Sequence, residues 1–245
     1  MFKKNKIRLG VNVDHVATLR QARGGTTVYP SLYDMVLRCV RGGAEQITIH
    51  LREDRRHIQL HDLQLLAKKC PVPLNLEMAA TPEALTLARK YKPAWVCLVP
   101  EKRAELTTEG GLNVMKHAKM MAPMIEKMQM RGIELSMFIE ASIDQVIASH
   151  NVGADAVEFH TGHWVLQKGA KKAKEWKRLV AAAELAHELG LGVHAGHGLD
   201  YEHARAIKKL PFLREVNIGH SLICYALEEG LEKSVRRMKK ILQEK

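Results

Sequence analysis

Short apolar runs alternate with longer amphipathic segments along most of this chain of 245 residues. The short runs are rich in β-branched residues, as buried strands are, and the longer segments carry apolar residues at helical spacing. The runs predict eight strands, at residues 8–13, 47–50, 73–76, 95–99, 134–139, 156–159, 191–195 and 215–218. Helices are predicted at 31–41, 61–69, 81–91, 113–131, 142–151, 170–189 and 201–209, and at the C-terminus. Strand and helix units repeated eight times in unbroken order predict an α/β fold, a (β/α)8 TIM barrel built as one domain over residues 1–245.

Three connecting segments carry signals of their own. Residues 18–25 contain Arg20 and Arg23 and end in two glycines, which predicts a loop. The polar run at 104–112 predicts an active-site loop that precedes a helix. In the segment 113–131, Pro123 predicts a break or an extra helix, because proline cannot donate the helical hydrogen bond. The methionines of that segment predict core packing or a subunit interface.

Titratable residues stand at the carboxyl ends of most of the predicted strands. In a parallel barrel these ends meet on one face, and active sites of this fold lie on that face. Histidines of a scaffold would scatter over helix surfaces and loops, whereas several of the thirteen here follow strands. The pattern therefore predicts an enzyme whose candidate residues are Asn12, Asp14, His15, His50, Arg52, Glu77, Glu101, Glu140, Glu158, His197 and His220.

Each candidate has a functional and a structural interpretation. Glu77 lies in the apolar run LNLEM, so its carboxyl must be paired or must have a raised pKa. Either state suits a general base, although a structural ion pair with an arginine is the alternative. His50 is a candidate base or a core histidine bonded to a backbone carbonyl. His197 stands between two glycines, which favours exposure to a ligand and lets backbone amides approach an anion. Gly219 and His220 open the last helix and could bind a second anion.

The formal net charge of +11 raises the question of a nucleic-acid partner. The excess lies in Lys3–Lys4, in 168–178 and in 236–245, and two of these segments are predicted helices. Lysines on such helices usually form a solvated face, and no zinc-finger or RNP-like motif is present. We therefore expect no nucleic-acid partner, and the positive charge suits small anionic substrates such as phosphate esters.

No apolar run approaches the length that spans a bilayer, so no membrane partner is expected. The start from Met1 to Lys6 is basic, with no apolar secretory segment behind it, which predicts a cytoplasmic protein. The four cysteines are widely spaced and predict reduced thiols in packed surroundings.

A metal site is the main alternative to metal-free acid/base chemistry. It would make the protein a metal-dependent barrel epimerase or lyase acting on a sugar phosphate. Arginines at the same strand ends, Arg23, Arg52, Arg55 and Arg56, oppose a cation and favour phosphates. A Schiff-base lysine is disfavoured, because no predicted strand contains a lysine in its interior. The metal site would draw on His50, Glu77, Glu158, His160 and His197.

Several motifs recur along nearly the whole chain: GVNVDHVATLRQARGG, ITIHLREDRRHI, NLEMA, CLVPEKR followed by LTTEGG, VEFHTG, AGHGL and NIGH. In this order and spacing the chain resembles the pyridoxine 5'-phosphate synthase family of the deoxyxylulose-phosphate-dependent vitamin B6 pathway. The resemblance implies a TIM barrel with extra helices, a homo-octamer, and neither a metal nor an organic cofactor. It also implies condensation of 3-amino-2-oxopropyl phosphate with 1-deoxy-D-xylulose 5-phosphate, with release of inorganic phosphate and water as the pyridine ring closes.

The resemblance implies a role for each candidate residue. His50 and Glu77 would be proton acceptors, His197 a proton donor, and Glu158 a stabiliser of transition-state charge. The segment Thr107 to Gly111 would close over the site and keep water from imine intermediates. The amino-oxopropyl phosphate would be held by Asn12, Arg23, Gly198, Gly219 and His220. The deoxyxylulose phosphate would be held by Asp14, His15, Arg52, His57 and Thr107.

The chain departs from the family pattern in three places. His194 stands where asparagine is more usual, the turn from Gly24 to Tyr29 is longer, and Trp164 follows His163. None of these positions carries an implied catalytic role. The departures concern loop detail and pH behaviour.

Overall fold

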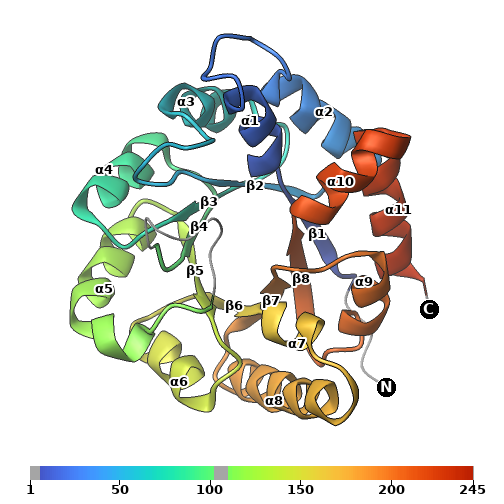
Figure 1. Cartoon of the computed structure of the whole chain (residues 1–245). Helices are drawn as coiled ribbons and strands as arrows, with labels where there is room; N and C mark the ends of the chain where they lie inside the picture. The colour runs from blue at the N-terminus through green and yellow to red at the C-terminus, as the bar shows by residue number, and fades with distance from the viewer. Residues whose placement is uncertain (1–5, 102–109, 245) are drawn as a thin grey trace.

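A computed structural model describes residues 6–101 and 110–244, and these residues form a closed barrel of eight parallel strands inside a ring of helices (Figure 1). Each strand pairs with the next along the chain, and β1 pairs with β8 to close the barrel. The predicted fold is confirmed, and the strand bounds agree within a few residues. The strands are β1 (Arg8–Asn12), β2 (Gln46–His50), β3 (Leu74–Met78), β4 (Trp95–Leu98), β5 (Glu134–Ile139), β6 (Ala156–His160), β7 (Gly192–Gly196) and β8 (Leu213–Ile218).

Helices follow every strand, and most begin or end at the residues that the sequence indicates. Ser31 caps α2 by accepting a hydrogen bond from the Asp34 amide, and Gly43 ends that helix in the left-handed conformation. Thr81 caps α4 in the same way, with Pro82 in its first turn. Among the described residues the helices are α1 (Asp14–Gln21), α2 (Leu32–Gly42), α3 (Leu60–Lys69), α4 (Pro82–Tyr91), α5 (Val114–Gln129), α6 (Ile143–Asn151), α7 (Gly162–Leu166), α8 (Gly169–Glu188), α9 (Tyr201–Ile207), α10 (His220–Glu229) and α11 (Leu231–Gln243).

The inside of the barrel is polar, whereas the layer between strands and helices is apolar. Along β2, Ile47 and Ile49 join the hydrophobic core, while Thr48 donates a hydrogen bond to Asn217 of β8. Gln46 likewise donates to Glu215 at 2.7 Å, so these side chains meet inside the cylinder. Alternation along each strand therefore sends one set of side chains into the helix layer and the other into the barrel.

The segment 18–25 was predicted as a loop, and that prediction is wrong for its first half. Residues 14–21 form α1, whose Val16 and Ala17 are buried against the barrel. Arg20 of this helix makes two hydrogen bonds to the buried Asp62 of α3, at 2.6 and 2.8 Å. A partner 42 residues away thus orders a stretch whose own sequence gives little helical signal.

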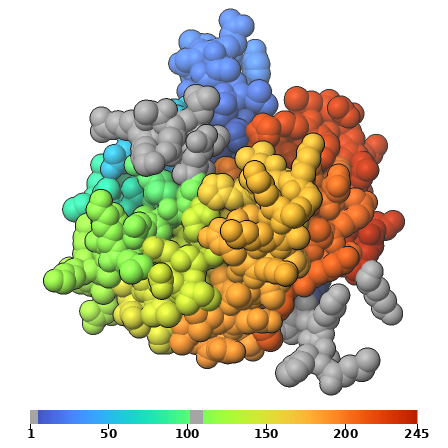
Figure 2. All heavy atoms as spheres, turned by 60° about the horizontal axis from the view of Figure 1, so that its bottom comes forward, coloured from blue at the N-terminus to red at the C-terminus, as the bar shows by residue number. Residues whose placement is uncertain are grey.

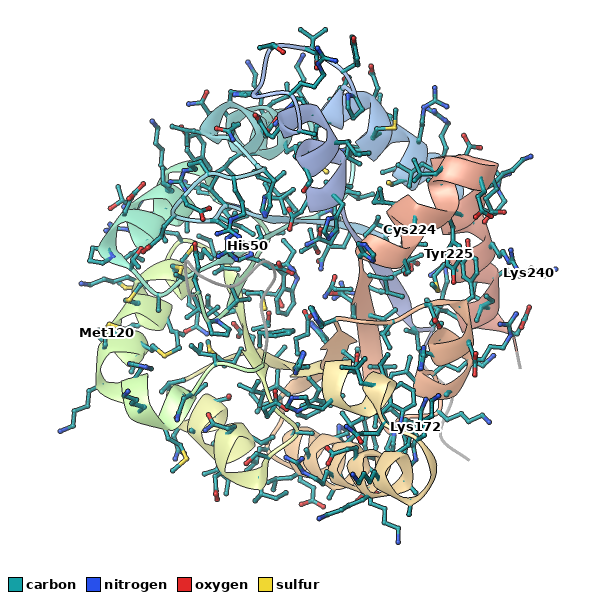
Figure 3. The ribbon with its side chains drawn as sticks, viewed as in Figure 1. His50, Met120, Lys172, Cys224, Tyr225 and Lys240 are labelled. Atoms are coloured by element: carbon teal, nitrogen blue, oxygen red, sulfur yellow. The ribbon has the colours of Figure 1, made fainter. Side chains whose placement is uncertain are left out.

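The break predicted at Pro123 is also wrong, because α5 continues through it from Val114 to Gln129. Met121, Met124 and Met128 are buried on the side of the helix that packs on β5, and this apolar contact outweighs one missing hydrogen bond. The methionine prediction is therefore confirmed for core packing at these positions. Met120 is exposed and lies on the outer side of α5 (Figure 3).

The connection between α1 and α2, residues 22–31, projects from the barrel (Figures 1 and 2). Val28 is 86% exposed and Tyr29 is 69% exposed on this segment.

The four cysteines have free thiols, but Cys224 is exposed rather than packed. Within the described ranges, no helix is long and apolar enough to cross a membrane.

Candidate active site

A pocket of about 560 Å³ opens at the carboxyl ends of the strands. It gathers residues that are far apart in the chain, from β1, β2, β3, β6 and the segments after β7 and β8. Twelve of the fourteen predicted catalytic and substrate-binding residues line this central pocket: Asn12, Asp14, His15, His50, Arg52, His57, Glu77, Glu158, His197, Gly198, Gly219 and His220.

Two predicted site residues are not in the pocket lining. Arg23 is exposed in the turn after α1 and does not contribute to the central pocket. Thr107 lies outside the described residues, as does most of the predicted loop at 104–112.

His50 ends β2 with its side chain almost fully buried, inside the ring of helices (Figure 3). Its backbone N–H donates to Asp14 Oδ1 at 2.8 Å, which ties β2 to the start of α1. Its ring nitrogens face two carboxylates, Glu77 at 3.9 Å and Glu101 at 3.6 Å. The ring is thus placed for proton exchange with acids.

Glu77 lies on β3, next to His50 across the strand pair. Burial raises the pKa of its carboxyl well above the ordinary value, and the nearby charges of Asp14 and Glu158 raise it further. A weak hydrogen bond from the Asn12 amide, at 3.5 Å, only partly offsets this effect. No arginine pairs with Glu77 among the described residues, so the structural alternative of an arginine ion pair fails there. The surroundings of Glu77 therefore favour the protonated form of its carboxyl.

Glu158 points into the barrel from β6 and is fully buried. Burial, together with the charge of Glu215, raises the pKa of Glu158 to about 8. Asn217 of β8 donates a hydrogen bond to it at 2.8 Å and fixes its position. Sequence reasoning missed Asn217, although an amide inside the apolar run EVNI is a signal that could have found it.

His197 follows β7 in the left-handed backbone conformation, with φ of 73°, which a histidine rarely adopts. The Thr161 hydroxyl lies 2.8 Å from the carbonyl of Gly196 and 2.5 Å from that of His197, and it stabilises this turn. Burial, together with the neighbouring His160, His15 and His220, lowers the pKa of His197 to about 4. Its imidazole is therefore neutral at neutral pH.

Another part of the pocket lining has features that favour an anion. Gly219 precedes α10, and a Cβ at this position would lie 3.0 Å from the Asn12 Cβ and 3.1 Å from its carbonyl oxygen. The close approach favours glycine, and it brings the N-terminus of α10, with its free amides, to the pocket. The rings of His15 and His220 meet edge to face at 4.9 Å beside it. Phosphate groups fit this environment.

The comparisons with known proteins identify the family of this chain. The family model "Pyridoxal phosphate biosynthesis protein PdxJ" matches residues 9–244. The chain belongs to the PdxJ family. It is 73% identical over 240 residues to the pyridoxine 5'-phosphate synthase of Bdellovibrio bacteriovorus, covering 98% of this chain and 100% of that one. The enzyme of the same name from Akkermansia muciniphila is 45% identical over 240 residues, covering 96% and 98%.

Solved structures similar to this PdxJ-family chain share its fold at low identity. KGPDC from Streptococcus mutans superposes with a TM-score of 0.65 at 10% identity, covering 98% of both chains. The tryptophan synthase alpha subunit from Campylobacter jejuni gives a TM-score of 0.62 at 12% identity, covering 98% and 96%. These likenesses support the barrel alone.

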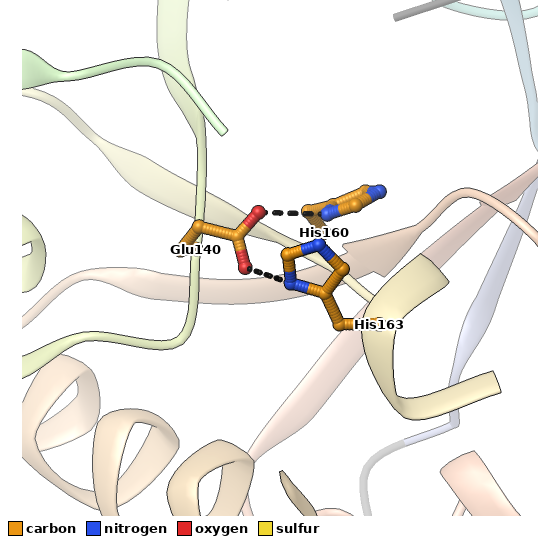
Figure 4. A group of neighbouring side chains, drawn as sticks. All are labelled: Glu140, His160 and His163. Carbon is orange, nitrogen blue, oxygen red and sulfur yellow. Dashed lines mark hydrogen bonds and ion pairs between the residues drawn. The ribbon is translucent and has the colours of Figure 1, made fainter. Parts of the chain in front are cut away.

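Two groups of side chains in this PdxJ-family member have metal-ligand geometry within the described ranges. Asp14, His50 and Glu77 form the first, which we name the Glu77 cluster. Glu140, His160 and His163 form the second, the Glu140 cluster (Figure 4). The five-residue metal site considered from sequence does not form as one group, because His160 lies with Glu140 and His163 instead.

Proposed function

We propose that this chain is a pyridoxine 5'-phosphate synthase that condenses 3-amino-2-oxopropyl phosphate with 1-deoxy-D-xylulose 5-phosphate. The products are pyridoxine 5'-phosphate, inorganic phosphate and water. The observation that carries the proposal is that His50, Glu77, Glu158 and His197 line one pocket that also has anion-binding features. Joining an amine to a ketone, eliminating phosphate and water, and closing a ring need repeated proton transfers at one place.

His50 and Glu77 are the proton acceptors in this proposal. Burial favours the protonated form of Glu77, so a positive charge that enters the pocket favours its action as a base. The ammonium group of the amino substrate supplies that charge and lowers the pKa of the carboxyl. His50, whose Nδ1 is 3.9 Å from Glu77, then takes part in moving the proton out of the dry pocket.

His197 is the proton donor, and Glu158 stabilises charge that develops on the reacting atoms in the transition state. A buried imidazole surrounded by three histidines carries no extra proton, as its low pKa indicates. Two phosphate groups bound in the same pocket reverse that balance, because nearby negative charge favours the imidazolium. Substrate binding thus prepares both His197 and Glu77 for opposite proton transfers.

The two substrates divide the pocket between them. Asn12, Gly198, Gly219 and His220 hold the amino-oxopropyl phosphate near the N-terminus of α10, with Arg23 reaching it from the turn after α1. Asp14, His15, Arg52 and His57 hold the deoxyxylulose phosphate, together with Thr107. Arginine suits this role because its guanidinium binds phosphate with two parallel hydrogen bonds.

The proposal extends to the cofactor requirement, the cellular compartment and the oligomeric state. The reaction proceeds without a metal or an organic cofactor, since acid/base groups suffice for imine formation, elimination and ring closure. The enzyme works in the cytoplasm, where its free thiols stay reduced. It assembles as a homo-oligomer, an octamer by resemblance to its family.

The direct test is to incubate the purified protein with both phosphates and to measure pyridoxine 5'-phosphate by its absorbance and mass. Product must require both substrates and persist in the presence of a chelator. His61→Ala, on the exposed surface of α3, serves as the folding and activity control. Absence of product refutes the proposal, and turnover abolished by a chelator favours the metal-dependent epimerase or lyase instead.

A further inference from the structure

The Glu140 cluster lies just outside the central pocket, and the proposed synthase reaction does not use it. Glu140 follows β5, His160 ends β6 and His163 lies in the first turn of α7. None of the three lines the pocket. The ring of His160 packs between Phe138 and His197, which do line it, at centroid distances of 5.5 and 5.0 Å.

Both imidazoles turn the same nitrogen toward one carboxylate (Figure 4). His160 Nδ1 is 2.8 Å from Glu140 Oε1, and His163 Nδ1 is 3.2 Å from Glu140 Oε2. Two ligand atoms that share a zinc ion at bonds of about 2.0–2.1 Å lie about 2.9–3.4 Å apart, depending on the angle between them. Both distances from the carboxylate are close to this range, and the three ligand groups offer atoms that all lie within 4.8 Å of one another.

The surroundings hold the cluster in place and leave one side open. The Gly111 amide donates to Glu140 Oε1 at 2.9 Å, and His160 is buried in contact with aromatic rings. Such supporting contacts orient metal ligands in known sites. The side chain of His163 is 57% exposed, so an ion can enter from solvent and keep a fourth position for water.

From this geometry we propose that Glu140, His160 and His163 bind one late first-row divalent metal ion, of the Zn²⁺ and Co²⁺ class. Two imidazoles and one carboxylate are the ligand set that such ions prefer over Mg²⁺ or Ca²⁺. On binding, the hydrogen that each Nδ1 shares with Glu140 is lost to water, each neutral imidazole carries its hydrogen on Nε2, and the Nδ1 lone pair binds the ion. The site has one negative charge, which the ion more than compensates.

The charge on the carboxylate separates this cluster from the Glu77 cluster. Burial alone would raise the pKa of Glu140, but the hydrogen bond with His160, the charges of the two imidazoles and the Gly111 amide together lower it. These contacts favour the ionised form of Glu140, which is the form that binds a metal. In the Glu77 cluster, Asp14 already accepts hydrogen bonds from Asn12 and from the His50 amide.

The test uses Co²⁺ as an optical probe on the full chain after treatment with a chelator. We expect one Co²⁺ per chain with a submillimolar dissociation constant and visible d–d absorption of a low-coordinate ion, displaced by Zn²⁺. Glu140→Gln and His163→Ala should each weaken binding at least about tenfold, by loss of one ligand. His163 is exposed enough that its replacement does not threaten folding.

Glu77→Gln is the matched control, since it makes the same isosteric change in the other cluster. It should leave Co²⁺ affinity within about twofold of the wild type, because additivity holds for separate sites. The proposal is overturned if no Co²⁺ binds, or if His163→Ala binds it as well as the wild type. Binding lost in Glu77→Gln but kept in Glu140→Gln also overturns it, because the ion then lies in the central pocket.

Discussion

Glu77 and Glu140 both lie at the carboxyl ends of barrel strands beside histidines, yet their pKa values move in opposite directions. Glu77 is buried among other carboxylates, so its charged form is disfavoured. Glu140 is partly exposed and accepts hydrogen bonds from an amide and an imidazole, so its charged form is stabilised. The surroundings of a glutamate, and not its residue type alone, therefore determine whether its carboxyl is neutral or ionised. A neutral carboxyl suits proton transfer, and an ionised carboxylate suits a cation.

The largest expected effect is on turnover in Glu77→Gln. The amide has the same shape but cannot exchange a proton, so we expect kcat to fall roughly 10²–10⁴-fold. Substrate binding should change far less. Steady-state rates with both substrates check this, and wild-type kcat in the variant would show that Glu77 is not a proton acceptor.

The second prediction concerns stability and pH at Glu158. Its folded pKa of about 8 lies above its unfolded value, so its favourable contribution is present below the unfolded pKa and is lost as pH rises through the folded one. Glu158→Gln removes this dependence. At pH above that folded pKa we expect the variant to be more stable than the wild type by on the order of 4 kcal/mol, while losing activity.

Denaturant unfolding of both proteins at acidic and alkaline pH measures this difference. The gap between variant and wild type should widen with rising pH. A constant gap would mean that Glu158 is ionised throughout.

The third prediction sets Glu140→Gln against Glu77→Gln. Glu140 contacts His160 and not the central pocket, so its replacement should lower kcat by less than about tenfold. Glu77→Gln should therefore lower turnover and keep metal affinity, whereas Glu140→Gln should keep most of the turnover and lower metal affinity. Equal loss of kcat in both variants would remove the distinction between the clusters.

The smallest effect is expected for Gly219→Ala, which tests the anion side of the pocket. A methyl group there presses on Asn12, whose amide bonds Asp14. We expect the KM for the amino substrate to rise several-fold with kcat nearly maintained, since a positioning contact is lost and not a proton-transfer group. A fall in kcat at unaltered KM would contradict the assignment.

Hydrophobic patterning predicted the barrel because each strand is a compact apolar run and the repeat leaves little choice of topology. The same logic brought His50 and His197 to one pocket, since strand ends of a closed barrel must converge. It failed at α1, where Arg20 depends on Asp62 in a different helix. It also failed at Pro123, where burial of neighbouring methionines decides the outcome.

Individual pairings within the site were harder to predict than its location. His160 was considered as a metal ligand together with residues of the central pocket because it ends a strand, but its Nδ1 faces Glu140. The direction of a side chain at a strand end depends on neighbours from other strands. Likewise the sequence around Asn217 indicates a buried amide but does not show that Glu158 is its partner.

The proposed proton transfers depend most on a neutral carboxyl at Glu77 before substrate binds. Infrared difference spectra between the wild type and Glu77→Gln at neutral pH measure this directly. We expect the wild type to show the band of a protonated carboxyl that is absent in the variant. When the amino substrate binds, a carboxylate band should replace it. A carboxylate band from Glu77 in the difference spectrum of the protein without substrate would contradict this expectation.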